Sequence, residues 1–188
     1  NLLQLINFSS ITSTDTATAE QTYDYEERKK NRALGIQICD EVNDSFNKLL
    51  ENLQTKFIIW QGRQWDGIDV YVPLKVDDNE FNLEFIFTKH YIRITFYSGT
   101  QKTRNNLIDF IKDNFVHDYP EMQIFPKEGH FVSLKKIDFP TNATWEERSA
   151  KYREMVMMEV ERILPKLATS IGTLMGQQGR SGDMATPD

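Results

Sequence analysis

Few residues of this 188-residue chain are of a type and spacing that could do chemistry. Asp69 and Glu84 fall on neighbouring predicted strands and on the same outer face, where a restriction-type nuclease would hold a divalent cation. Such a site also needs a lysine two residues after the second acid, and Ile86 occupies that position. A four-residue loop at 77–80 would leave the two carboxylates several residues apart, too far to share one ion. The pattern therefore favours a solvated polar face over a nuclease.

No other catalytic motif is present. The sequence lacks a phosphate loop, a dinucleotide fingerprint, a nucleophile elbow and a zinc-protease motif. His90, His117 and His130 are isolated, at spacings that match no metal motif. Cys39 is the only cysteine, and its position beside the apolar Ile38 predicts a buried, inert thiol. We therefore predict no catalytic residue, no metal site and no cofactor, and lean against an enzyme.

Strands are predicted in the middle of the chain, where apolar and polar residues alternate with a period of two. The alternating runs are 68–76, 82–88 and 91–97. A tight turn at Lys89 and His90 sets Phe87 opposite Ile92, Phe85 opposite Ile94 and Leu83 opposite Phe96. The loop at 77–80 sets Val76 opposite Phe81, Leu74 opposite Leu83, Val72 opposite Phe85 and Val70 opposite Phe87. Both choices place the apolar side chains on one face of a three-stranded meander.

Helical periodicity flanks these strands. An apolar stripe predicts a helix over 20–54, and a second helix is expected over 102–115. A hairpin follows, with Ile124 opposite Val132, and Gly129 is expected to supply a positive φ in its loop. Thr144 and Glu147 form a capping box that begins a long helix, which Pro165 should kink or interrupt. The fold class is therefore α+β: an antiparallel sheet of about five to six strands with an N-terminal, a middle and a long C-terminal helix.

The domain boundaries follow from composition. Residues 1–19 read as a linker or the remnant of an upstream segment, 20–175 as a single α+β domain, and 176–188 as a disordered tail. The chain starts without Met, so we expect a fragment of a longer protein. No run is long enough for a membrane span and the start does not resemble a signal peptide. With a single cysteine, these features favour the cytoplasm.

Two surfaces are candidates for binding. The outer face of the predicted sheet is polar but carries Tyr71, Arg93 and Tyr97. The loop before it holds Trp60, Arg63 and Trp65, and exposed Trp and Arg are enriched at binding hot spots. The alternative for the loop is that its two tryptophans cap the edge of the core.

The arrangement of sparse aromatic and glycine positions resembles a known family. The sheet opens on Trp60-x-Gly62 with Gly67-Ile68 following; a strand then runs into Lys102 and a helix, and a hairpin, Trp145 and a long amphipathic helix complete the pattern. This resembles an uncharacterised bacterial domain usually found C-terminal to restriction-nuclease-like modules, over roughly residues 32–175. The resemblance implies an accessory or recognition role in a bacterial defence or DNA-processing protein. That family has no established catalytic residues to transfer.

We accordingly expect a non-catalytic interaction module whose partner is another protein or an upstream domain. The formal charge of −6 does not favour nucleic acid as the partner, although a local basic patch leaves it open. Two alternatives stay open. The order of elements is similar to that of the homodimeric chaperones of type III secretion, and the acidic pair leaves a divergent nuclease.

Overall fold

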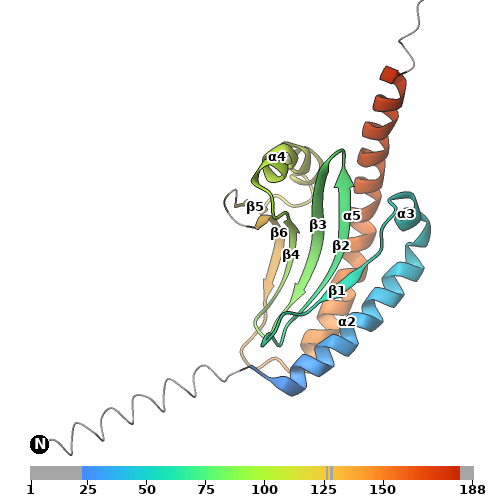
Figure 1. Cartoon of the computed structure of the whole chain (residues 1–188). Coiled ribbons are helices and arrows are strands. Elements are labelled where there is room, and N and C mark those ends of the chain that lie inside the picture. Colours follow the sequence, from blue (N-terminus) through green and yellow to red (C-terminus); the bar gives the residue numbers. More distant parts are fainter. Residues whose placement is uncertain (1–22, 126, 128, 183–188) are drawn as a thin grey trace, which may run out of the picture.

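The computed structural model describes residues 23–125, 127 and 129–182, which form a six-stranded sheet with its main helices against one face (Figure 1). The helices are α2 (Tyr25–Ser45), α3 (Asn47–Asn52), α4 (Gln101–Phe115) and α5 (Trp145–Gly182). The strands are β1 (Ile58–Trp60), β2 (Ile68–Val76), β3 (Asn79–Phe87), β4 (Tyr91–Tyr97), β5 (Gln123–Ile124) and β6 (His130–Asp138). Their order is β1-β2-β3-β4-β6-β5, with every neighbouring pair antiparallel. The predicted α+β class is confirmed.

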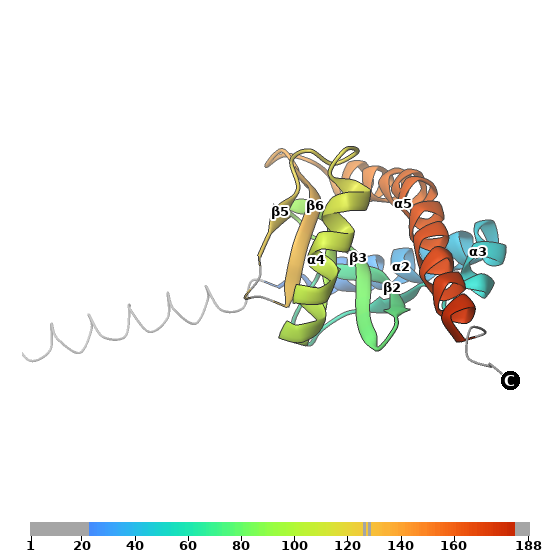
Figure 2. The same cartoon turned by 90° about the horizontal axis from the view of Figure 1, so that it is seen from above.

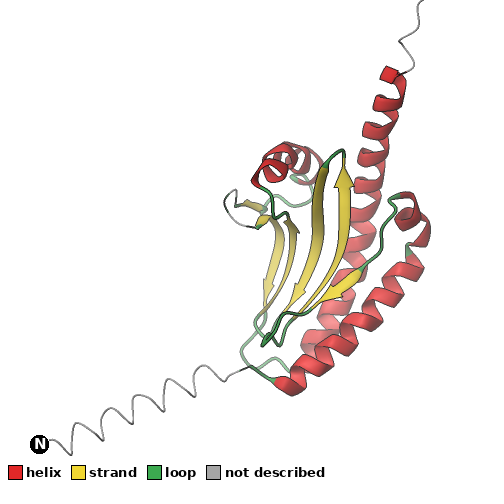
Figure 3. Ribbon diagram, in the orientation of Figure 1, coloured by secondary structure: helices red, strands yellow, loops and turns green. Residues whose placement is uncertain are grey.

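The two faces of the sheet differ in what covers them. The apolar row predicted for the inner face is buried, and it packs against α2, α4 and α5 in a single core. Figure 3 shows α5 running behind the strands, while no helix lies in front of β2, β3 and β4. The polar outer face is therefore the side of the sheet that helices leave free.

The register between β3 and β4 is the predicted one. Phe87 pairs with Ile92, Phe85 with Ile94 and Leu83 with Phe96. The turn at Lys89 and His90 lacks favoured turn residues, but Thr88 supports it. The Thr88 hydroxyl accepts hydrogen bonds from the amides of His90 and Tyr91, both at 3.1 Å. A side chain thus supplies what the turn sequence does not.

The predicted register between β2 and β3 is wrong by two residues. Val70 pairs with Phe85, Val72 with Leu83 and Leu74 with Phe81. The connection is a two-residue turn at Asp77 and Asp78 rather than a four-residue loop, and Asp77 takes a φ of 54°. Aspartate tolerates this left-handed conformation, which hairpin turns of this length require. A shift of two residues keeps every side chain on its predicted face but changes its neighbours across the pair.

Several predicted helix features need correction. The single helix expected over 20–54 is two, because Phe46 leaves the helical conformation between α2 and α3. Pro165 does not interrupt α5, which continues through it as one curved helix at the right of Figure 2. The capping box is confirmed: the Glu147 amide donates to the Thr144 hydroxyl at 3.2 Å, and the Thr144 amide donates to the Glu147 carboxylate at 3.0 Å.

The ends of the chain are only partly described. The linker predicted at 1–19 lies outside the described residues, as do 20–22 and 183–188. The tail predicted from residue 176 is helical as far as Gly182, where α5 ends. Within the described residues, no helix combines the length and apolar character needed to cross a bilayer.

Candidate functional site

A pocket of about 310 Å³ opens on the outer face of the sheet. We call it the acidic–aromatic pocket, and its lining residues come from β1, β2, β3, β4 and β6: Trp60, Asp69, Tyr71, Asn82, Glu84, Tyr97 and His130. Three of the predicted binding residues, Trp60, Tyr71 and Tyr97, are among them. The volume lies at the lower end of the range for small-ligand sites. The free face of the sheet is thus hollowed where aromatic and acidic side chains meet.

The floor of the pocket is a pair of carboxyl groups that the predicted register had separated. Tyr71 pairs with Glu84 and Asp69 with Ile86, so Glu84 is the diagonal neighbour of Asp69. The two carboxyl groups lie close enough for the charge of Glu84 to act on Asp69. Burial raises the pKa of Asp69 well above its usual value, and the adjacent charge of Glu84 raises it further. Burial and the neighbouring acid therefore both favour the protonated form of Asp69.

The two acids differ in how they are satisfied. Glu84 is 6% exposed, and its Oε2 lies 2.7 Å from Nε2 of His130. Asp69 is 5% exposed, and its Oδ1 is buried without a hydrogen-bond partner among the described residues. Buried polar atoms are normally hydrogen-bonded, because leaving one unsatisfied costs about 1–3 kcal/mol. Oδ1 of Asp69 is therefore a buried polar atom whose hydrogen-bonding capacity the described residues leave unused.

Aromatic side chains form the walls. On one side, Trp60 is 55% exposed and its ring lies 5.5 Å from that of Trp65, at an interplanar angle of 40°. On the other side, the Tyr97 ring lies 5.1 Å from the His130 ring in an edge-on arrangement. Gly129 makes this position accessible, since a Cβ there would lie 2.5 Å from the Tyr97 ring. Gly129 thus serves close approach, not the predicted positive φ, which no described glycine adopts.

Helix α2 fixes the loop that carries the tryptophans. Nη1 of Arg28 donates to the carbonyl oxygens of Gly62 and Trp65, at 2.5 and 2.6 Å. Nε2 of Gln61 donates to the carbonyls of Arg28 and Gly67, at 3.1 and 2.9 Å. The structure separates the two tryptophans, which each interpretation of the loop had treated together. Trp65 is half-buried against the domain, and Trp60 is left exposed at the pocket.

The predicted arginines lie outside the pocket. Arg63 is exposed in the loop. Arg93 is on the outer face of β4, with its guanidinium 5.4 Å from the centre of the Tyr91 ring and its Nε buried without a partner among the described residues. The structure thus groups Trp60, Tyr71 and Tyr97, with Trp65 behind Trp60, but not the two cations.

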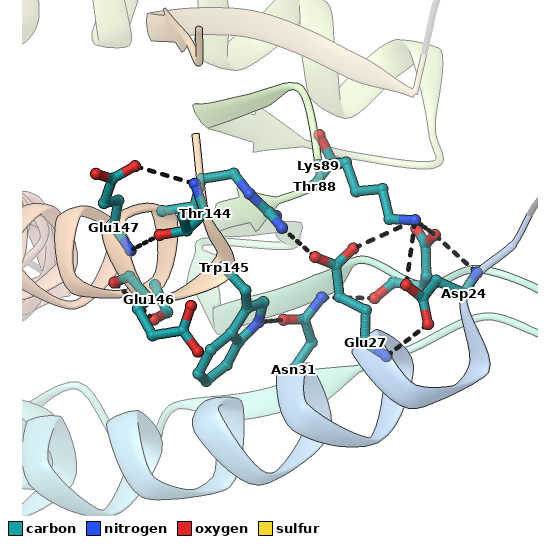
Figure 4. Close-up of polar contacts among 12 residues, drawn as sticks. Asp24, Glu27, Asn31, Thr88, Lys89, Thr144, Trp145, Glu146 and Glu147 are labelled. Carbon is teal, nitrogen blue, oxygen red and sulfur yellow. Dashed lines mark hydrogen bonds and ion pairs between the residues drawn. The ribbon is translucent and has the colours of Figure 1, made fainter. Parts of the chain in front are cut away.

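A second polar cluster lies where the N-terminal ends of α2 and α5 meet the turn between β3 and β4 (Figure 4). We call it the α2–α5 cluster, and it consists of Asp24, Glu27, Asn31, Asp66, Lys89, Trp145 and Arg148. Arg148 forms a buried ion pair with Glu27. Lys89 lies 3.5 Å from Asp24, 3.6 Å from Asp66 and 3.9 Å from Glu27.

The same cluster joins its elements by neutral hydrogen bonds. Nε1 of Trp145 donates to Oδ1 of Asn31 at 2.8 Å, and Nδ2 of Asn31 donates to the carbonyl of Asp66 at 2.6 Å. Every charged residue of the cluster has an opposite charge beside it, so the cluster is suited to holding α2, α5 and the tryptophan loop together.

The remaining predictions about chemistry concern the thiol and metals. Burial raises the pKa of Cys39 to about 12, as expected of an inert thiol. Within the described residues, no three His, Cys, Asp or Glu side chains converge as metal ligands.

Comparison of the chain with protein families, curated proteins and solved structures found no match. The function of the pocket is therefore argued from its own residues.

Sequence reasoning placed Asn82 on the outer face without singling it out, missed His130, and set aside Asp69 and Glu84. The prediction placed both acids on the correct face of the sheet. It set them several residues apart only because it gave the turn at 77–80 four residues instead of two. His130 was recoverable in part, because the correctly predicted pairing of Ile124 with Val132 places it at the start of β6. Its position opposite Tyr97 depends on shifts in the β4–β6 register, which no sequence pattern marks.

Proposed function

We propose that this chain is a non-catalytic recognition module that binds a partner at the free face of its sheet, with the acidic–aromatic pocket as the contact point. One observation carries the proposal. Asp69 is buried at the floor of a hollow between exposed and half-buried aromatic side chains, and its Oδ1 has no partner among the described residues. Binding sites combine apolar walls with a few polar groups of this kind.

The same proposal includes the biological setting suggested by the sequence. The resemblance carried by Trp60, Gly62, Gly67 and Trp145 supports an accessory role in a bacterial defence or DNA-processing protein. The partner would be another protein or an upstream domain. Trp60 supports a macromolecular contact, because exposed tryptophans contribute disproportionately to protein interfaces.

A second candidate, the divergent nuclease, is favoured by the adjacency of Asp69 and Glu84. It lacks the lysine, since Ile86 stands at that position and is 8% exposed. Incubating the chain with DNA and Mg²⁺ tests this candidate. Cleavage that Asp69→Ala abolishes would support it, and cleavage that survives Asp69→Ala would remove the pocket from the reaction.

The recognition proposal is tested by a pull-down from bacterial lysate with three versions of the full chain as bait. The pocket variant is Trp60→Ala with Tyr97→Ala. The matched control is Ile36→Ala with Met158→Ala, which also removes two large side chains, each about half exposed, but from α2 and α5. A partner retained by wild type and control but lost by the pocket variant is the expected result.

Two further outcomes are informative. Equal recovery by all three baits would contradict the proposal. A nuclease-treated arm separates protein from nucleic acid, and nucleic acid lost on treatment and at high salt would redirect attention to Arg63, Arg93 and Lys102. Light scattering on the same samples tests the chaperone alternative, which requires a dimer.

A further inference from the structure

The chemistry of the acidic–aromatic pocket defines the ligand that it would accept. Its seven lining residues include two acids and four aromatic rings, counting His130, but no lysine or arginine. The field inside it is therefore set by carboxyl oxygens and by the negative faces of aromatic rings. Both attract positive charge.

From this geometry, and resting on the proposed function, we propose that the pocket binds an organic ammonium group, with Asp69 and Glu84 below it and Trp60, Tyr71 and Tyr97 around it. A substituted ammonium carries its charge on an apolar surface. It can therefore satisfy a carboxylate and contact aromatic faces at the same time, which a strongly hydrated inorganic ion does less well.

The unpartnered oxygen of Asp69 makes the site more than a patch of acidic residues. Glu84 already has His130 at 2.7 Å, so its charge is partly accommodated within the protein. Asp69 is 5% exposed, and its Oδ1 lacks a hydrogen-bond donor among the described residues. Because this oxygen is enclosed, a cation in the pocket would stabilise it through its charge, without a hydrogen bond to it.

The walls are built in place before any ligand arrives. Trp60 is held by its contact with Trp65 and by a loop that Arg28 and Gln61 fix through four hydrogen bonds. Tyr97 is held between His130 and the backbone at Gly129. Preformed walls reduce the entropy lost on binding, because few side chains remain to be ordered.

Neutral polyhydroxyl ligands are the main competitor, since sugars also bind between aromatic rings and carboxylates. The arrangement favours a cation because the acids lie adjacent and are buried. Adjacent carboxyl groups repel one another in their ionised forms, so burial beside Glu84 favours the protonated form of Asp69. A positive ligand relieves that repulsion, and a neutral ligand does not.

The test is a two-dimensional NMR titration of the full chain, with the indole N–H of Trp60 as the reporter. Two cationic probes are used: tetramethylammonium chloride, and a short peptide with one trimethyl-lysine. Each has a neutral counterpart, tert-butyl alcohol and the same peptide with norleucine, and sodium chloride maintains constant ionic strength. A glucose titration covers the neutral competitor.

Three variants complete the experiment. Asp69→Asn with Glu84→Gln removes the negative charge but keeps shape and hydrogen bonding. Trp60→Ala removes a wall from an exposed position, where folding is not at risk; binding is then followed at the Tyr97 ring. Asp78→Asn is the matched control, because it removes one exposed acid from the β2–β3 turn.

We expect both ammonium probes to bind the wild type and Asp78→Asn, and both neutral counterparts to fail. Affinity should fall about tenfold or more in the amide double variant and in Trp60→Ala. Equal affinity for the two ammonium probes would indicate a small free amine, whereas tighter binding of the peptide would indicate a modified side chain of a macromolecule.

Binding of the neutral counterparts or glucose as tightly as the cations would overturn the ammonium assignment. Unchanged affinity in the amide double variant would do the same. The pull-down then separates the two proposals. If the pocket variant still loses its partner, recognition stands and only the ligand class falls. If the partner is also retained, both proposals fail.

Discussion

The molecule contains two buried groups of charged side chains, and they are satisfied in opposite ways. In the α2–α5 cluster, Arg148 and Glu27 are each under a tenth exposed and bind one another, and Lys89 lies among three acids. In the acidic–aromatic pocket, Asp69 faces a second acid and keeps one oxygen unpartnered among the described residues. Buried charges are normally paired, as in the cluster.

The two groups differ in whether opposite charges lie beside each acid. The cluster joins three elements and leaves no charge unopposed, although Oε2 of Glu27 and Nη1 of Arg148 lack a hydrogen-bond partner among the described residues. The pocket places two acids side by side at a concave surface, with no lysine or arginine in its lining, and this raises the pKa of Asp69. Perturbed acids in a pocket are for this reason indicators of function.

The largest effect is expected from breaking the cluster. Arg148→Met leaves Glu27 buried without its partner, so the free energy of unfolding should fall by about 3–5 kcal/mol. The matched control is Arg153→Met, whose ion pair with Glu41 is more than a third exposed on both sides and should cost less than about 1 kcal/mol. Urea denaturation measures both variants. Similar decreases in the free energy of unfolding for the two variants would show that the buried ion pair stabilises the fold no more than the exposed one does.

A smaller difference is expected between two tryptophans. Trp145→Phe removes the hydrogen bond to Asn31, which is fully buried, and should cost about 1–3 kcal/mol. Trp60→Phe is expected to change stability by less than about 0.5 kcal/mol, because Trp60 is more than half exposed. Thermal unfolding followed by circular dichroism compares them. The assignment of Trp60 to the pocket would be weakened if its replacement were the more damaging.

The pocket itself is tested by the pH dependence of stability. The pKa of Asp69 is 3.8 in the unfolded chain and well above that in the fold, first because of burial and then because of Glu84. Below about pH 4 both states hold the proton, so the contribution of Asp69 to stability is complete. As the pH rises through the pKa that Asp69 has in the folded state, ionisation of Asp69 favours the unfolded state, and the contribution of Asp69 to the free energy of unfolding is lost.

Asp69→Asn should remove this loss, because an amide does not ionise. Cys39 and Tyr152 also lie within the field of Asp69, but their ordinary pKa values are 9.0 and 10.0, so both stay protonated in the folded and the unfolded chain below about pH 8. Urea denaturation between about pH 4 and about pH 8 should therefore give a flatter profile for the variant. Parallel profiles would mean that Asp69 is ionised in the fold.

The sequence was sufficient for the fold because face and period are local properties. Alternation fixed which side chains of β2, β3 and β4 face the core, and the capping box at Thr144 fixed the start of α5. It was not sufficient for the pocket, because Asp69 and Glu84 meet only if the turn between them has two residues. The left-handed conformation of Asp77 allows a two-residue turn. The turn sequence, Asp77-Asp78, is a weaker hairpin signal than Asp-Gly.

The remaining parts of the site depend on tertiary contacts with no local pattern. Arg28 reaches the tryptophan loop across 34 and 37 residues of sequence. Arg104 opposes the dipole of α4 at its first turn and reads as solvated, yet it is buried and donates to the carbonyl of Ser98 at 2.7 Å. Neither contact is encoded by spacing, so neither could be read before the fold was known.

Gly129→Ala is expected to have only a small effect on stability, and it tests whether the wall formed by Tyr97 matters to the pocket. The new Cβ would lie 2.5 Å from the Tyr97 ring, so the ring must rotate away from its place beside His130. Because the ring is half-buried and can move, the free energy of unfolding should change by less than about 1 kcal/mol, while affinity for tetramethylammonium falls by about tenfold or less.

Gly99→Ala is the matched control, since its Cβ would meet the Tyr97 hydroxyl at an ordinary 3.9 Å and leave the ring in place. A loss of binding in Gly129→Ala alone would show that the position of Tyr97, and not merely the acids, defines the pocket. Equal binding in both would reduce the site to its carboxyl floor and to Trp60.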